Sequence, residues 1–102
     1  MTRTERIHSE GRKIHSYPYR LYVLDNGEGE EDCVVISVPK KLFKRAVRRN
    51  LIRRRTREAL RHCRADFPEI SGKGMILVYI ADKVLDYGQI TDGLRNLLAK
   101  IQ

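Results

Sequence analysis

The residues of this chain that could do chemistry are concentrated in a basic segment, residues 40–64. The segment holds twelve of the 21 lysines and arginines and a single acid, Glu58, whereas the rest of the chain has more acids than bases. Arginine outnumbers lysine nine to three there, and a guanidinium can bind a phosphate through two parallel hydrogen bonds. Like charges this dense repel one another, and a polyanion offsets that repulsion when it releases condensed counterions. The segment therefore predicts a surface that binds nucleic acid.

The alternative for the basic segment is a solvated helix face stabilised by ion pairs between successive turns. One glutamate can neutralise only one of the twelve basic side chains, so eleven charges would stay uncompensated. The basic segment is therefore better explained by binding to a polyanion.

No catalytic or metal-binding motif is apparent. The chain lacks G-x-S-x-G, a phosphate-binding glycine loop and H-E-x-x-H. Acids cluster in residues 25–32, where a glycine-rich turn explains them better than a metal site does. Cys33 and Cys63 stand apart without metal-ligand spacing, so we expect buried, reduced thiols. We predict neither catalytic residues nor a metal site.

The composition of the chain limits which classes of protein it can belong to. A chain of 102 residues with 41% apolar residues suits one domain, residues 1–102, with a core of its own. No apolar run approaches the ~20 residues of a membrane span, and residues 1–13 lack the apolar centre of a secretory signal. We expect a cytoplasmic protein that does not contact the membrane.

The apolar pattern then indicates the elements that position the basic segment. Period-two alternation predicts a strand over residues 18–25, and β-branched runs predict strands over 33–38 and 75–81, each buried on both faces. We expect the first two to pair as an antiparallel hairpin, with a short extra strand possible near residues 12–16. Helices are predicted over residues 44–64 and after Asp86. Together these elements indicate an α+β fold, in which helices pack on one mixed sheet.

Both predicted helices have an apolar stripe. Asp86 and Gln89 have the spacing of a capping box before the second helix. The stripes are Ile52, Thr56, Ala59, Leu60 and Cys63 in the first helix, and Ile90, Leu94, Leu97, Leu98 and Ile101 in the second. Opposite the first stripe, at 100° per residue, lie Asn50, Arg53, Arg54, Arg57, Arg61 and Arg64. The first helix thus has one face for the core and one for anions.

The strand at 18–25 places aromatic residues on both faces. Tyr19 shares a face with Leu21 and Val23, so packing within the sheet explains it. Tyr22 lies on the other face beside Arg20, where it could either pack or stack on a base of single-stranded nucleic acid. Both interpretations of Tyr22 are open.

Residues 46–58, AVRRNLIRRRTRE, resemble the signature A-V-x-R-N-R-x-[KR]-R-x-x-R-E of the protein component of bacterial ribonuclease P. Ser37-Val38-Pro39-Lys40-Lys41 resembles the strand end that precedes this helix in the family. Gly11 matches a glycine that ends the family's first helix. The chain departs from the pattern at Leu51, which replaces an arginine, and at His8, which replaces an aromatic residue.

The resemblance implies a fold and a function. The fold would be a two-layer α/β sandwich with about four strands and a left-handed βαβ crossover, against the right-handed rule for such connections. The family's RNA subunit hydrolyses precursor tRNA with Mg²⁺ bound mainly by RNA and substrate, while the protein binds that RNA and the 5′ leader. RNA contacts are expected from Lys40, Lys41, Arg45, Arg48, Arg49, Asn50, Arg53, Arg54, Arg57 and Arg61, and leader contacts from Arg20, Tyr22 and His8.

The expected partners are therefore a ribonuclease P RNA and precursor tRNA, without a protein oligomer. One alternative is a general or ribosome-associated RNA-binding protein of similar fold, which would not distinguish precursor from mature tRNA. A second is a protein-only nuclease, which the missing cluster of acids or histidines argues against.

Overall fold

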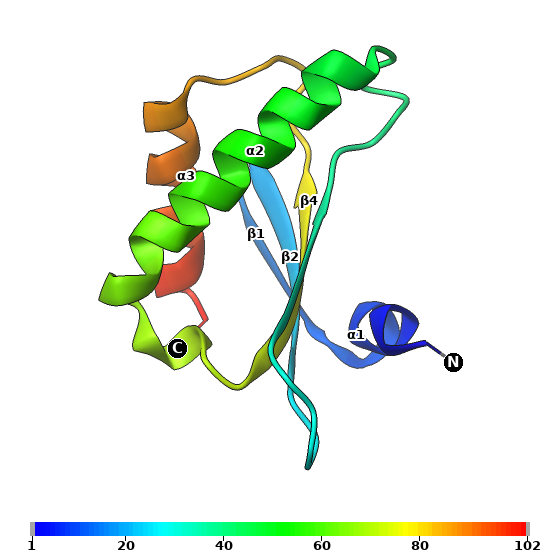
Figure 1. Ribbon diagram of the computed structural model, residues 1–102, viewed down its shortest axis with the longest axis vertical. Coiled ribbons are helices and arrows are strands. Elements are labelled where there is room, and N and C mark those ends of the chain that lie inside the picture. Colours follow the sequence, from blue (N-terminus) through cyan, green and yellow to red (C-terminus); the bar gives the residue numbers. More distant parts are fainter. Residues whose placement is uncertain (1, 102) are drawn as a thin grey trace.

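The computed structural model describes residues 2–101, except for the side chain of Glu69, and its centre is a four-stranded sheet. The strands lie in the order β1-β2-β4-β3. Helices α2 and α3 cover one face of the sheet and α1 lies on the other (Figure 1). The elements are α1 (Arg3–Glu10), β1 (Arg12–Ser16), β2 (Tyr19–Asp25), β3 (Cys33–Ser37), α2 (Ala46–Cys63), β4 (Lys73–Tyr79) and α3 (Tyr87–Ala99), with short 3-10 turns η1 (Arg64–Asp66) and η2 (Pro68–Ile70) before β4.

The predicted hairpin between residues 18–25 and 33–38 is wrong, because β4 lies between these two strands. β2 pairs antiparallel with β4, and β3 pairs parallel with β4. A strand that is apolar on both faces is best buried in the middle of a sheet, and β4 takes that place. The antiparallel hairpin is instead formed by β1 and β2. β3, α2 and β4 make the βαβ unit, whose left-handed crossover stays a prediction from the resemblance.

The core lies between the sheet and the α2–α3 layer, as predicted. Tyr19, Leu21 and Val23 are opposite Tyr79, Leu77 and Met75, and all six are buried. All ten residues of the two predicted helical stripes are buried as well. The capping box of α3 is confirmed, since the Asp86 side chain accepts from the Gln89 N–H at 2.9 Å and the Gln89 side chain accepts from the Asp86 N–H at 3.2 Å.

The prediction that the 33–38 strand is buried on both faces is wrong for β3. All five of its residues are only half-buried, because β3 is an edge strand and its two faces are incompletely covered. Cys33 is therefore half-buried rather than buried, whereas Cys63 is buried as expected, and both are free thiols. β3 thus presents apolar side chains on both faces of the sheet edge.

Candidate nucleic-acid interface

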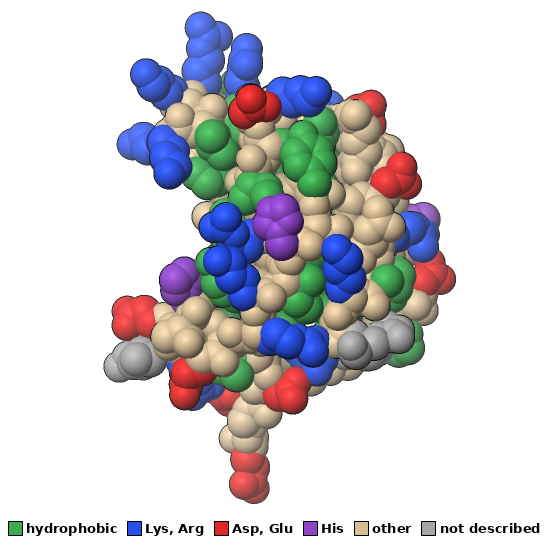
Figure 2. Space-filling model, turned by 180° about the vertical axis from the view of Figure 1, so that it is seen from behind, with side chains coloured by type: hydrophobic (Ala, Val, Ile, Leu, Met, Phe, Trp, Pro, Cys, Tyr) green, Lys and Arg blue, Asp and Glu red, His purple; other side chains and the backbone are tan. Residues whose placement is uncertain are grey.

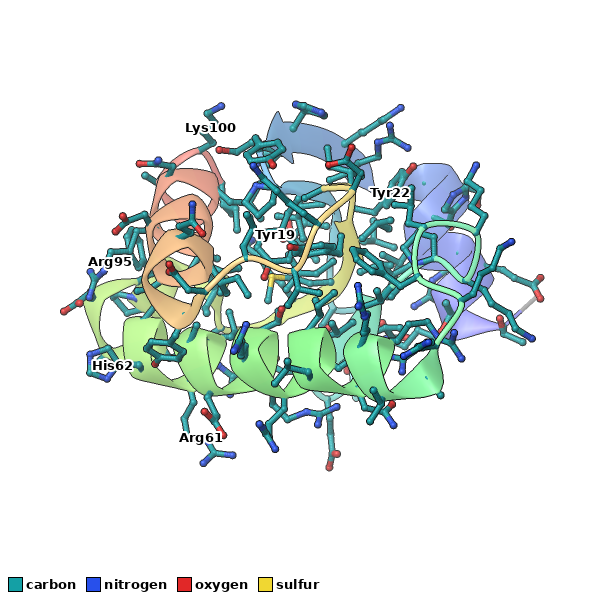
Figure 3. The ribbon with its side chains drawn as sticks, turned by 90° about the horizontal axis from the view of Figure 1, so that it is seen from above. Tyr19, Tyr22, Arg61, His62, Arg95 and Lys100 are labelled. Carbon is teal, nitrogen blue, oxygen red and sulfur yellow. The ribbon has the colours of Figure 1, made fainter. Side chains whose placement is uncertain are left out.

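Helix α2 presents its basic residues on the side away from the core. Its apolar stripe packs inward, and Figure 3 shows Arg61 directed away from the sheet. Of the predicted RNA-binding residues, the structure exposes Lys40, Lys41, Arg45, Arg48, Asn50, Arg54, Arg57 and Arg61, and leaves Arg49 and Arg53 half-buried. Of the six residues that the helical wheel placed opposite the apolar stripe, Arg53 is half-buried and the other five are exposed.

The charge of this surface is not neutralised within the protein. Among the side chains that the structure describes, no carboxylate forms an ion pair with a lysine or arginine of residues 40–64. Three arginines of this segment, Arg49, Arg53 and Arg55, bind neutral oxygens instead. Arg49 Nη1 donates to the carbonyls of Phe43 and Lys44 at 2.7 and 2.9 Å, and Arg53 Nη1 donates to Asn50 Oδ1 at 3.0 Å. The positive charge of this surface is therefore available to bind anions.

The N-terminus of α2 adds to this capacity. Arg45 occupies the cap without a capping side-chain hydrogen bond, and the first turn holds no acid. Arginines at this end oppose the helix dipole, whose positive pole lies there, and leave backbone N–H groups available. An anion bound at this end would interact favourably with the helix dipole and accept hydrogen bonds from the free N–H groups. The arrangement therefore favours phosphate.

The back of α2 is fixed to the core by hydrogen bonds. The hydroxyls of Thr56 and Tyr19 are 2.6 Å apart in the core. Burial raises the pKa of Tyr19 well above its ordinary value, because the phenolate would lose its hydration. Arg55 Nη1 donates to the Leu85 carbonyl at 2.7 Å, which ties α2 to the segment before α3. The basic side chains therefore project from a rigidly held helix.

A second candidate surface is an apolar cleft on the opposite face of the sheet. It is a hollow of about 490 Å³ between α1 and the β3–β4 edge. Figure 2 shows this side of the molecule hollowed beneath a group of basic side chains. The lining residues are Thr4, Glu5 and His8 from α1, Val35 and Ser37 from β3, and Ile76 and Val78 from β4. We call this hollow the sheet cleft.

Two of the three predicted leader-binding residues meet beside the sheet cleft. The rings of His8 and Tyr22 are 4.5 Å apart between centroids, with planes tilted by 36°. Tyr22 is half-exposed and lies opposite Ile76, a cleft-lining residue, in the neighbouring strand. Figure 3 shows Tyr19 on the α2 side of the sheet and Tyr22 on the α1 side. The structure therefore places Tyr22 where a base could stack on it.

Arg20 is the third predicted leader-binding residue. It lies on the same sheet face as Tyr22, opposite the cleft residue Val78. The Nε of Arg20 is buried and has no hydrogen-bond partner among the described residues. A buried N–H group without an acceptor lowers the folding stability, unless a ligand accepts a hydrogen bond from it.

Helix α1, which walls the sheet cleft, buries a single side chain and is further held by polar contacts. Ile7 is its only buried residue and packs over Gly74. Arg6 forms an ion pair with Glu30, and Arg3 Nε lies 3.7 Å from Oε2 of the same glutamate. Arg3 also donates a hydrogen bond to the side chain of Asn26. A hydrogen bond from the Gly27 N–H, together with Arg6, lowers the pKa of Glu30 below its ordinary value. The acidic 26–32 loop thus holds α1 on the sheet.

The residues that attach α1 were not identified from the sequence. Two features of the sequence nevertheless indicate this attachment. An isolated glycine inside a strand pattern, such as Gly74, indicates close approach of another segment. Residues 3–6, RTER, have charges complementary to the acidic 25–32 loop. The loop that sequence reasoning assigned only to turn formation therefore also positions the cleft wall.

The described residues contain no group of three or more His, Cys, Asp or Glu side chains placed to bind a metal ion. Likewise, no helix in the described part of the chain is long and apolar enough to cross a membrane. The two surfaces differ in their chemistry: the α2 surface is cationic, and the sheet cleft is apolar and aromatic.

The comparisons with known proteins agree with this geometry. A family model described as Ribonuclease P matches residues 3–102. The RNase P protein of Staphylococcus aureus is 27% identical, with 97% of this chain and 88% of that chain covered and a TM-score of 0.81. The RNase P protein of Thermotoga maritima shares the fold, at 23% identity, with 98% and 92% covered and a TM-score of 0.83. No curated protein sequence matches the chain.

Proposed function

The chain belongs to the ribonuclease P protein family, and we propose that it binds the RNA subunit of that enzyme through α2 and the 5′ leader of precursor tRNA through the sheet cleft. Membership of this family makes the chain an RNA-binding subunit of a tRNA-processing endoribonuclease. It therefore supports a subunit of a ribonucleoprotein rather than a general RNA-binding protein. The proposal concerns which surface performs which part of that work. We further propose that one copy acts with one RNA, in the cytoplasm.

The assignment of α2 to the RNA subunit rests on its uncompensated charge. A folded RNA offers many phosphates in fixed positions, and exposed arginines along a rigid helix can bind several of them at once. The hydrogen bonds of Arg49 and Arg53 to neutral oxygens orient their guanidinium groups without removing charge. The α2 surface therefore suits a large, structured polyanion.

The assignment of the sheet cleft to the leader rests on one observation, the His8–Tyr22 ring pair beside an apolar hollow. Single-stranded RNA exposes its bases, which stack on aromatic rings and fill apolar hollows, whereas paired RNA does not. Mature tRNA has no 5′ leader. A cleft that binds the leader therefore raises affinity for precursor over mature tRNA.

In this proposal the protein makes no covalent step. Hydrolysis of the phosphodiester bond between the leader and the mature 5′ end would take place on the RNA subunit, and the RNA and substrate, rather than residues of this chain, would hold the Mg²⁺ that supplies the metal chemistry. The arginines of α2 reduce repulsion between RNA strands, and the cleft fixes the leader so that the scissile phosphate is oriented. The protein thus contributes binding energy and position.

The test is a pair of dissociation constants, for precursor and mature tRNA, measured with the enzyme reconstituted from the protein and a ribonuclease P RNA at fixed salt and Mg²⁺. Base stacking on an aromatic ring is worth about 1–3 kcal/mol, so Tyr22→Ala should weaken precursor binding by about five- to 150-fold. Binding of mature tRNA and of the RNA subunit should be unchanged. Equal losses for both tRNAs would remove the leader from the sheet cleft.

A further inference from the structure

Strand β3 presents a second hollow, on the face opposite the sheet cleft. Val35 and Ser37 line the sheet cleft, whereas Val34 and Ile36 point to the α2 side, opposite Met75 and Leu77 of β4. There, β3 and the C-terminal half of α2 enclose a hollow of about 220 Å³. Its lining residues are Val34, Ile36, Leu60, Arg57, Arg61 and Arg64. We call this hollow the β3 groove.

The β3 groove combines an apolar floor with a cationic rim. Val34 and Ile36 are half-buried and pack against the core, so the floor is firm. Arg57, Arg61 and Arg64 are exposed and form no ion pair with any carboxylate that the structure describes. Among the residues that the structure describes, no acid lines the groove. A ligand that fits it must have a flat or compact apolar part and at least one anionic group.

We propose that the β3 groove binds an unpaired nucleotide of the RNA subunit, with its base on Val34, Ile36 and Leu60 and its phosphates on the three arginines. The inference rests on the proposed binding of the RNA subunit by α2. At 1.5 Å per residue, Arg53 and Arg61 are roughly 12 Å apart along the helix axis, so an RNA that follows α2 reaches the groove. Arg57 belongs to both surfaces.

Two other occupants are less consistent with the groove. An acidic peptide could pair with the unpaired edge of β3, and so could β3 of a second copy of the chain. A second copy would bring its own arginines against these three, which like-charge repulsion opposes. The precursor leader is assigned to the opposite face of the sheet. Continuity with the α2 surface favours the RNA subunit over a peptide.

The probe is a set of three RNA hairpins that differ at one position. The first has a single-nucleotide bulge, the second has an abasic nucleotide at the bulge, and the third is fully paired. The bulged and abasic hairpins have the same number of phosphates, so a difference between them measures the base alone. We expect the wild-type protein to bind the bulged hairpin about fivefold more tightly than the abasic one, which corresponds to about 1 kcal/mol.

Variants locate the contact. Arg64→Gln removes one rim charge and should weaken binding of the bulged and abasic hairpins alike, because both have the same phosphates. Val34→Thr keeps the shape of a half-buried side chain while adding a hydroxyl under the base, and should abolish the preference for the bulged over the abasic hairpin. Tyr22→Ala, on the opposite sheet face, should keep it. Lys83→Gln is the control for loss of one positive charge elsewhere. Thermal melting of each variant, with a midpoint within a few degrees of wild type, excludes unfolding as the cause.

Each of the following outcomes would overturn the proposal for the β3 groove. Tight, salt-dependent binding of all three hairpins without a preference would overturn the groove and leave the proposed function of α2 intact. Weak binding of all three, with no salt dependence, would overturn both. A preference that disappears in Tyr22→Ala but survives in Val34→Thr would place the base in the sheet cleft. Concentration-dependent dimers in light scattering that Val34→Thr abolishes would assign the groove to a second copy.

Discussion

The side chain of Ile7 lies so close over Gly74 that a Cβ atom built on the glycine would be 2.7 Å from Ile7 Cδ1. Ile7 is the one buried residue of α1, so this contact fixes the distance between α1 and the sheet. The Ile7 side chain could shift to accommodate a methyl group, but a larger residue would have to displace the helix. The width of the sheet cleft therefore depends on a residue without a side chain.

Gly74→Val should widen the sheet cleft and weaken binding of precursor tRNA. Overpacking of this kind typically costs about 1–3 kcal/mol of folding stability, so the melting midpoint should fall as well. The measurement is the ratio of the precursor and mature tRNA dissociation constants. Gly88→Ala, in the first turn of α3 where a Cβ meets only Asp86 at 3.4 Å, is the matched control and should leave that ratio unchanged.

Glu30→Gln should loosen α1 without unfolding the protein. The substitution removes the ion pairs with Arg3 and Arg6, and exposed or half-exposed pairs contribute at most about 1 kcal/mol each. Amide hydrogen exchange in residues 3–10 should accelerate, and discrimination between precursor and mature tRNA should decrease. Glu28→Gln makes the same charge change in the same loop and should do neither. Exchange rates that match in the two variants would show that Glu30 does not hold α1.

Replacing Arg53 and Arg57 by Ala should weaken binding to the RNA subunit and reduce its salt dependence. Each lost phosphate contact removes about one unit from the slope of log K against log salt, so the slope should flatten by up to about two units. Folding stability should change by less than ~1 kcal/mol, because the basic face lies outside the core. A double variant with an unchanged slope would place the RNA on another surface.

The folded protein should lose stability as pH rises above about 10. Burial raises the pKa of Tyr19 above its unfolded value near 10, and burial raises that of Tyr79 too. The unfolded chain therefore releases these protons first, and stability that is complete below pH 10 declines above it. Denaturant midpoints measured between pH 8 and 11 test this. Tyr19→Phe should make the decline shallower, at the cost of the hydrogen bond to Thr56.

Much of the fold could be predicted because it depends on local periodicity. The buried stripes of α2 and α3, the two faces of β2 and the capping box of α3 all follow from residue spacing within one element. The same spacing placed the arginines of α2 outward and Tyr22 on the face opposite Tyr19. These features require no knowledge of which element packs against which.

Strand pairing could not be predicted in the same way. The apolar run in β3 resembles that of β4, yet β4 is central and β3 is at the edge, because partner choice depends on all the strands together. Helix α1 was missed by periodicity since it buries a single residue. Its position depends on contacts with Gly74 and Glu30, which are distant in sequence. The sheet cleft was therefore expected only from family resemblance, although Tyr22 itself was singled out from its strand face.

The presence of a single buried side chain in α1 has a consequence for how this protein can change over evolutionary time. Ile7 is the one buried residue of α1, and no residue of α1 belongs to the core cluster between the sheet and the α2–α3 layer, so substitutions at the exposed positions of residues 3–10 leave that core untouched. If the sheet cleft binds the leader as proposed, variation in His8, Thr4 or Glu5 would alter which leader sequences are preferred while the chain still folds. The proposed leader preference would then evolve independently of folding stability.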